Sequence, residues 1–439
     1  MDATALAGAS PGKARPLFCR ARFSRVSAAR VIYGAPMIHP ALAQSCQNAL
    51  PATLEMLRAM VTINSFTENA EGVNRLGEFT AECFASLGFS PTYVQAPVAG
   101  YGRHLVLKRP WVEGAPTIAL ISHLDTVYPV AEEARNAFAW RQDGDRIHGP
   151  GTNDIKGGTV LIHQTLAALA EVCPSEFAGT NWVVLLNACE ETISEDFGKV
   201  CRAQLPANTL ACLIFEADGG EDDGWTLVSA RKGRATFFLD VEGRGAHAGS
   251  VPRNGANAIA ELARLVLEIE AMTDYAAGLT VNIGSIRGGT VMNRVPHEAH
   301  AEMEMRAFDP ALYAATRQRI FDLAGPGKIP GCTIRVTVGH ETVPWPPNPG
   351  TDRLLGLWKR TGEELGMKVE SLDRGGLSDG NVLWNHFPTL DGLGPRGEHS
   401  HCSEHSTDGS KVQEYVDVSS FVPKAVLNAT AILGLLGSR

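Results

Sequence analysis

Three strongly apolar runs dominate the first half of this sequence, at 117–122, 182–187 and 211–215. Each run is long enough for a strand that is buried on both faces of a parallel sheet. The helical pattern at 157–172, between the first two runs, supplies the crossover that parallel neighbours need. Each run is followed by a cluster of His, Asp or Glu. Because open α/β sheets bind ligands at the carboxyl ends of their strands, the sequence predicts an α/β fold with a polar site at that edge.

The length of the chain, 439 residues, exceeds what one hydrophobic core usually supports, so we expect two domains. From about residue 229 the pattern changes to alternating strands and amphipathic helices, expected at 235–242, 257–272, 279–285, 299–307, 311–323 and 332–338. That β-α-β-β-α-β order is typical of a ferredoxin-like module. The sequence therefore predicts a catalytic domain with a mixed, mainly parallel sheet at 50–228 and 345–439, interrupted by a ferredoxin-like α+β lid at 229–344.

The beginning of the chain differs in composition from the rest. The first 52 residues hold one acid, Asp2, and six basic residues, which are Lys13, Arg15, Arg20, Arg22, Arg25 and Arg30. We interpret residues 1–49 as a basic, disordered segment. An exported protein that loses this segment is the alternative, because Ala41-Leu42-Ala43 resembles the small-residue cleavage site of a secretory signal.

Composition limits the class of partner. The formal net charge of −9 argues against nucleic acid, which a basic surface would bind. No apolar run reaches the roughly 18 residues of a membrane span, so we expect no membrane partner. Nine scattered cysteines without a CxxC pair favour reduced thiols and a cytoplasmic protein. A small molecule or peptide is the expected substrate.

The first two polar clusters each allow a functional and a structural interpretation. His123 and Asp125 lie two residues apart at a strand end, so both side chains share a face. There the carboxylate can orient an imidazole that binds a metal, although a solvated pair is the simpler alternative. Asp154 stands in a glycine-rich turn, at 149–158, just before a helix. It either caps that helix or faces a ligand, and the turn lacks the spacing of a phosphate-binding loop.

The remaining clusters are also rich in carboxylates and imidazoles. Glu190 and Glu191 are adjacent acids after a buried strand, and they repel each other unless cations or protons compensate them. Glu216 follows the next strand, and the loop 394–405 contains three histidines. Any one cluster alone is compatible with the surface. Five polar clusters at successive strand ends are hard to attribute to chance, and they indicate a shared functional site.

These motifs, in this order and spacing, resemble the M20 family of metallopeptidases, and most of all its glutamate carboxypeptidase and deacylase branch, over roughly 50–437. The resemblance implies two zinc ions, with cobalt or manganese as alternatives. It implies that the metal ligands are His123 and Glu216 for one ion, Glu191 and His401 for the other, and Asp154 as the bridge between them. It also implies that Asp125 holds His123 and that Glu190 is the general base.

The chemistry of these residue types agrees with the resemblance. Imidazole and carboxylate ligands suit zinc, and two ions roughly 3.5–4 Å apart need a bridging group. A Glu that binds no metal can take a proton from a zinc-activated water and pass it to the leaving amine. Since adjacent residues point to different sides, Glu190 and Glu191 can divide these two tasks.

The resemblance extends to the lid. His247 resembles the family histidine that polarises the scissile carbonyl, often supplied across a dimer interface, so a homodimer through the lid is expected. The positions that match substrate contacts in the family are Arg306, Asn293, Lys232 and Ser378. Arg is the natural partner of a substrate carboxylate. A local ion pair between Arg306 and Glu304 is the alternative.

Two departures from the family pattern limit the prediction. The run 403–413 lengthens the segment after the expected C-terminal ligand, so His399 and His405 stay alternatives to His401. The segment 340–343 lacks the second Arg that is usual in glutamate carboxypeptidases, so a preference for Glu is not implied. The leading prediction is hydrolysis of an N-acyl amino acid or of a C-terminal peptide bond. The alternatives are an amidohydrolase for non-peptide amides, such as N-carbamoyl amino acids, and a non-catalytic binding protein with the same fold.

Overall fold

The structure, a computed structural model, describes residues 40–192, 195–220 and 224–437. Most of the expected N-terminal segment, 1–39, lies outside these residues. The expectation for 40–49 is wrong, because the first helix, α1, covers Pro40–Val61. Leu42 and Cys46 are fully buried, and with Leu57 they extend the apolar face of α1 toward its first turn. The Ala41-Leu42-Ala43 motif therefore belongs to a packed helix.

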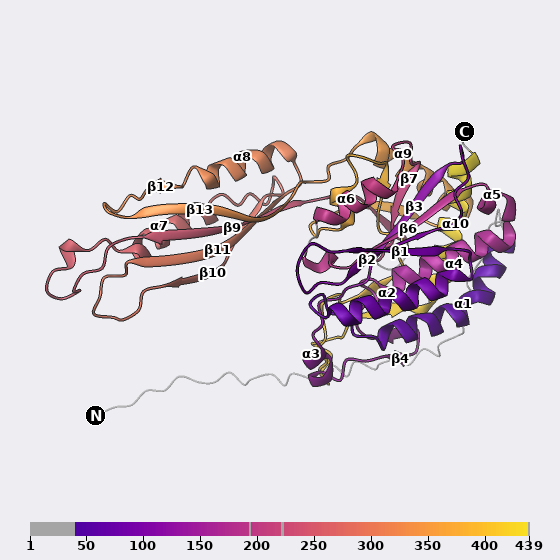
Figure 1. Cartoon of the computed structure of the whole chain (residues 1–439), viewed down its shortest axis with the longest axis horizontal. Helices are drawn as coiled ribbons and strands as arrows, with labels where there is room; N and C mark the ends of the chain where they lie inside the picture. Colours follow the sequence, from indigo (N-terminus) through magenta and orange to yellow (C-terminus); the bar gives the residue numbers. More distant parts are fainter. Residues whose placement is uncertain (1–39, 193–194, 221–223, 438–439) are drawn as a thin grey trace, which may run out of the picture. The chain divides into compact units, whose positions relative to one another are not determined.

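The catalytic domain is built on a six-stranded mixed sheet (Figure 1). Its strand order is β1 (Ser90–Gln95), β2 (Arg103–Lys108), β6 (Asn181–Asn187), β3 (Thr117–His123), β7 (Ala211–Ile214) and β15 (Thr389–Leu390). The pairs β3–β6, β3–β7 and β7–β15 are parallel, whereas β1–β2 and β2–β6 are antiparallel. The predicted mixed, mainly parallel sheet is confirmed.

Both faces of this sheet are buried because alternate residues of each strand enter different cores. On β3, Ile118 and Leu120 join the larger core, and Ala119 and Ile121 join the smaller one. The helices that pack on the larger core are α1, α2 (Ala70–Ala85), α4 (Lys156–Val172), α9 (Pro349–Glu364) and α10 (Phe421–Gly437). Helix α6 (Glu195–Gln204) covers the other face with Phe197 and Cys201. The apolar runs are thus strands because they are covered on both sides.

Helix α10 and the turn before it form an apolar segment, Val418–Gly437, whose length and composition alone would allow it to cross a membrane. Its mean hydropathy is 1.4, but 72% of that window is buried inside the protein. The helix packs against α1, α4 and α9. Its apolar character therefore reflects its place in the core.

The lid confirms the predicted order of elements. It consists of β9 (Gly233–Glu242), α7 (Ala258–Glu270), β10 (Thr280–Gly288), β11 (Glu298–Ala307), α8 (Pro310–Phe321) and β13 (Thr333–Thr342), with the short β12 (Gly325–Pro326) at the edge. The strands form an antiparallel sheet in the order β10-β11-β9-β13-β12. Alternate residues of β9, such as Phe237 and Leu239, meet Leu262 and Leu265 of α7 in a separate core.

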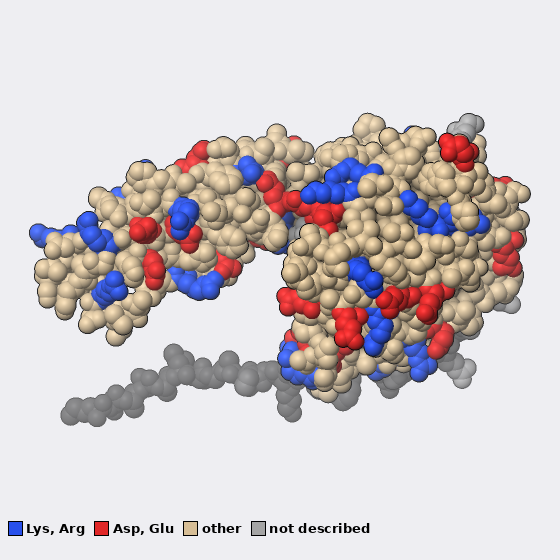
Figure 2. Space-filling view, in the orientation of Figure 1, with Lys and Arg blue, Asp and Glu red and all other residues tan. Residues whose placement is uncertain are grey.

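Several short elements were not predicted. They are β8 (Trp225–Arg231) with its parallel partner β14 (Val369–Arg374), the small sheet of β4 (Arg141–Asp143), β5 (Arg146–His148), β16 (Gly397–Glu398) and β17 (Tyr415–Asp417), helices α3 (Val130–Arg135) and α5 (Pro174–Ala178), and the 3₁₀ turns η1 (Glu190–Thr192), η2 (Pro252–Asn254), η3 (Asp379–Val382) and η4 (Val418–Ser420). Acidic and basic side chains are interspersed over the molecular face in Figure 2.

Candidate metal centre

Two groups of ligand side chains meet at Asp154. One group is His123, Asp154 and Glu216, and the other is Asp154, Glu191 and His401, and within each group the ligand atoms lie within 4.8 Å of one another. His123 Nε2 is 3.0 Å from Asp154 Oδ1, whereas His401 Nε2 is 3.3 Å from Asp154 Oδ2. The two oxygens of one carboxylate therefore face different groups, which is the arrangement of a bridging ligand between two metals.

The remaining contacts complete each group. His123 Nε2 lies 3.8 Å from Glu216 Oε1, and His401 Nε2 lies 3.1 Å from Glu191 Oε2. The sheet places these side chains, because His123 ends β3, Glu191 follows β6 and Glu216 follows β7. Asp154 precedes α4, and the loop after β16 supplies His401. All five sequence-predicted metal ligands are thus brought together, while His399 and His405 belong to neither group.

The electrostatics of these groups fit divalent cations. Burial, followed by repulsion from Asp154, raises the pKa of Glu191 to about 7 and that of Glu216 to about 8. Hydrogen bonds to Asp154 and Glu191 raise the pKa of His401 to about 11. One oxygen, Glu191 Oε1, is buried and has no hydrogen-bond partner among the described residues. Clustered carboxylates that need compensating positive charge, with imidazoles beside them, are the donor set that zinc binds.

Asp125 contacts both His123 and the turn that carries the two glutamates. His123 Nδ1 is 3.0 Å from the Asp125 carbonyl oxygen and 3.4 Å from its Oδ1. The Asp125 carboxylate accepts hydrogen bonds from the backbone N–H groups of Glu190 and Glu191, at 3.0 and 3.2 Å. Thr67 donates to the same carboxylate at 2.7 Å. The predicted contact with His123 is therefore present, but most of the hydrogen bonds of this carboxylate hold the glutamate turn.

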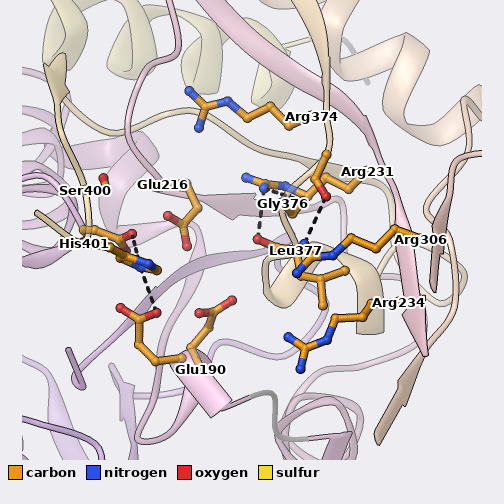
Figure 3. A pocket seen from close by; sticks show the side chains of 13 residues that line it. Glu190, Glu216, Arg231, Arg234, Arg306, Arg374, Gly376, Leu377, Ser400 and His401 are labelled. Atoms are coloured by element: carbon orange, nitrogen blue, oxygen red, sulfur yellow. Dashed lines mark hydrogen bonds and ion pairs between the residues drawn. The ribbon is translucent and has the colours of Figure 1, made fainter. Parts of the chain in front are cut away.

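Glu190 faces a cavity of about 390 Å³ (Figure 3). Asp154, Glu191, Glu216 and His401 line the same cavity. Burial, opposed by the nearby His123, raises the pKa of Glu190 well above its usual value. The Glu190 carboxylate makes no hydrogen bond with another described residue, and it lies outside both ligand groups. It is thus placed beside the metal groups without being part of them, as a proton acceptor requires.

Four arginines also line this cavity, and they differ in their partners. Arg231 is buried and pairs with Asp391, with its Nη2 2.7 Å from Oδ2. Arg306 binds Glu304 through Nε and Nη2, at 2.9 and 3.2 Å, so the local ion pair expected as an alternative is present. Arg234 lies 3.4 Å from the same carboxylate.

Arg374, the last residue of β14, is the fourth of these arginines. Its guanidinium makes no hydrogen bond or ion pair with any residue in the described part of the chain, and burial lowers its pKa. Arg374 was not predicted from the sequence, because one arginine on a short, mostly exposed strand carries no motif. Its position directly before Gly375-Gly376 is the only signal that the sequence offers.

Four other predicted site residues, His247, Asn293, Lys232 and Ser378, are not among those that line the cavity. His247 and Asn293 lie close together in the lid, where the Ala248 N–H donates to the Asn293 carbonyl at 2.9 Å. Nζ of Lys232 lies 5.4 Å from the centre of the Phe308 ring. The Ser378 hydroxyl donates to Asp391 Oδ2 at 2.8 Å. Their contacts with substrate stay predictions.

Comparisons with known proteins agree with this fold. Residues 229–341 match the peptidase dimerisation domain M20_dimer. Carboxypeptidase G2 from Pseudomonas sp. (strain RS-16) is 28% identical over 432 residues, which cover 95% of this chain and 99% of that protein. The structure of aminopeptidase PepT from Bacillus cereus ATCC 10987 matches with a TM-score of 0.69 and 22% identity, over 89% of this chain and 99% of that one.

A second solved structure, an M20 family metallo-carboxypeptidase, Sso-CP2, from Sulfolobus solfataricus, matches with a TM-score of 0.64 and 14% identity, over 88% of this chain and 99% of that one. The two structures share the fold of this chain, including the inserted lid. The family match lies in the lid, and the likeness to carboxypeptidase G2 spans both domains. These comparisons indicate a metallopeptidase-type hydrolase, similar over both domains to carboxypeptidase G2 and matching the M20 dimerisation domain in its lid.

Proposed function

We propose that this protein is a di-zinc hydrolase that cleaves the amide bond of an N-acyl amino acid or the C-terminal bond of a peptide. The observation that carries the proposal is the division of the Asp154 carboxylate between two ligand groups. The likeness to carboxypeptidase G2 over both domains supports cleavage of a C-terminal peptide bond.

The residues that would hold the two ions are His123, Asp154 and Glu216 for one, and Asp154, Glu191 and His401 for the other. Zinc held by these residues would supply a water-derived nucleophile at neutral pH. Cobalt or manganese would serve with the same ligands.

Glu190 is the proposed general base. Its carboxylate lines the cavity. Neither carboxylate oxygen makes a hydrogen bond with another described residue. It takes a proton from the attacking water and gives it to the leaving nitrogen. Burial raises its pKa, which brings the carboxyl closer to the pH range in which it can both accept and release a proton.

Arginines in the cavity support a substrate with a free carboxylate. Arg231 is already paired with Asp391 and Arg306 with Glu304. Arg374 has no such partner in the described residues, and its guanidinium lies on the wall of the cavity beside Glu216 (Figure 3). A planar guanidinium binds a carboxylate through two parallel hydrogen bonds. Arg374 is therefore our first candidate for this contact, ahead of Arg306.

We further propose that the protein works as a homodimer in the cytoplasm. His247 and Asn293 are apart from the cavity residues of their own chain, so they would act in the site of a second copy. The neighbouring Val291 is 59% exposed and Met292 is fully exposed. Exposed apolar side chains of this kind are frequent at protein interfaces.

The test is an assay of the metal-free and zinc-loaded protein against N-acyl amino acids, dipeptides and N-carbamoyl amino acids. We expect zinc-dependent hydrolysis of one of the first two classes. Activity on N-carbamoyl amino acids alone would replace this proposal by the amidohydrolase alternative. Full activity after verified metal removal would refute the metal mechanism.

A further inference from the structure

The turn after β6, which carries Glu190 and Glu191, is held by side chains that accept its backbone N–H groups. Four successive N–H groups are involved. The Ala188 N–H donates to His104 Nδ1 at 3.1 Å, Cys189 N–H to Asn187 Oδ1 at 3.1 Å, and the Glu190 and Glu191 N–H groups to the two oxygens of Asp125. Regular strand pairing does not supply these contacts, because the β2–β6 ladder ends at Leu186.

Each accepting side chain is held in turn by a second group. Asn187 Nδ2 donates to Asp379 Oδ1 at 2.7 Å, and Thr67 donates to Asp125. His104 Nε2 lies 2.9 Å from Asp196 Oδ2. His104 is fully buried, and its ring packs against Phe197 with the ring centres 5.3 Å apart. The position of the glutamate turn is therefore defined by side chains from β2, β6 and the segment after β3.

The two hydrogen bonds of His104 determine which nitrogen of its neutral ring carries the proton. Nδ1 accepts a hydrogen from a backbone N–H, so it carries no proton of its own. In a neutral imidazole the proton is then on Nε2, which donates it to Asp196. The carboxylate of Asp196 thus selects the tautomer in which Nδ1 can accept from Ala188.

A third metal site is the competing interpretation, since His104, Cys189 and Asp196 place ligand atoms within 4.8 Å of one another. A metal would need a lone pair on a ring nitrogen. Nδ1 is engaged by Ala188 and Nε2 carries the proton. A metal could bind only if this hydrogen-bond pattern were given up, and the geometry therefore favours a hydrogen-bonded support.

We propose that His104, oriented by Asp196, is a positioning residue for the turn that presents Glu190 to the substrate and Glu191 to the metal. The inference rests on the proposed function, in which Glu190 is the base. His104 touches neither the substrate cavity nor the ligand groups. It acts through the Ala188 N–H, three residues before the predicted metal ligand of the same turn.

Two substitutions of His104 distinguish its hydrogen bond with Ala188 from its hydrogen bond with Asp196. H104L removes the acceptor for Ala188 and keeps an apolar side chain of similar size. H104N keeps an acceptor, because the Asn Oδ1 occupies nearly the place of Nδ1, but it does not reach Asp196. H163L is the matched control, since His163 of α4 is a partly buried histidine, packed on Phe84 and absent from the turn's contacts.

The first readout is hydrogen exchange of the backbone at 186–192, followed by mass spectrometry on the folded protein with and without zinc. We expect faster exchange in H104L, and unchanged exchange in H104N and H163L. The second readout is steady-state kinetics on the zinc-loaded enzyme. We expect kcat of H104L to fall on the order of 10- to 100-fold, as displacement of a catalytic group by about 1 Å implies, with KM within about threefold and two metals retained.

The kinetics of H104N distinguish positioning from simple burial. Its kcat is expected to stay within about fivefold of the unchanged protein. Unchanged exchange in H104L, an equal loss of kcat in H104N and H104L, or an effect confined to KM would overturn the proposal. So would a third metal ion that is lost in both variants. If the zinc-loaded protein hydrolysed no substrate, the proposed function would fail, and the exchange data would still decide whether His104 holds the turn.

Discussion

Replacing Arg374 by Ala should selectively weaken the use of substrates that end in a free carboxylate. The Arg374 guanidinium lines the cavity and makes no ion pair with the residues that the structure describes. Loss of one partner of a desolvated charge pair costs about 2–5 kcal/mol. Because this cavity is open to solvent, we expect the lower end, about 2–3 kcal/mol, which corresponds to roughly 30- to 150-fold in kcat/KM.

R306A provides the matched control. Arg306 already binds Glu304, and its side chain is about one quarter exposed. Exposed ion pairs contribute about 0.2–1 kcal/mol, so the loss in kcat/KM should be less than about fivefold. R374K should recover only part of the activity, because an ammonium group lacks the two-pronged geometry of a guanidinium.

The assay is steady-state kinetics on a matched pair of substrates, one with a free carboxylate and one with the corresponding amide. R374A should affect the acid strongly and the amide little. Equal losses on both substrates would mean that Arg374 has a structural role. If R306A lost more kcat/KM on the acid than R374A did, Arg306 would be the residue that binds the substrate carboxylate, as the sequence resemblance implies.

Three further predictions concern the metal centre. E190Q should retain two metals and lose kcat by about 10²- to 10⁴-fold, since an amide cannot accept the proton. Elemental analysis measures the metal content, and steady-state kinetics measures kcat. Near-normal turnover would mean that another residue is the general base. H401A should lower the zinc content, whereas H405A should leave it unchanged. The reverse result would identify His405 as the ligand. Zinc affinity should weaken as pH falls from about 8.5 to 6. Burial raises the pKa of Glu216 to about 8 and that of Glu191 to about 7. Over this range both carboxyl groups take up protons, which zinc must displace in order to bind. Competition with a chromophoric chelator measures the affinity, and a constant value over this range would contradict the assignment.

The sequence predicted the parts of the site that lie at strand ends. Runs such as 117–122 are apolar on both faces, and this pattern identifies a buried strand and so the edge at which His123 must stand. The shared site then follows from the geometry of parallel strands. The lid was also predictable, because the alternation in β9 and the helical period in α7 are each set by a single buried face.

Other parts depend on contacts between distant segments, and local patterns do not encode them. Arg374 reaches the cavity from β14, which pairs with β8 outside the six-stranded sheet. His104 reads as an ordinary residue at the start of β2, and its role depends on Asp196, 92 residues later. The beginning of α1 was missed because the composition of the first 52 residues concealed an apolar face that starts at Leu42.

In the proposed mechanism one carboxylate, Asp154, bridges two metal ions. Anomalous diffraction at the zinc edge, from crystals of the zinc-loaded protein, tests it most directly. We expect two peaks roughly 3.5–4 Å apart, one beside His123 and Glu216 and the other beside Glu191 and His401, with Asp154 between them. A single peak, or two peaks without Asp154 between them, would contradict it.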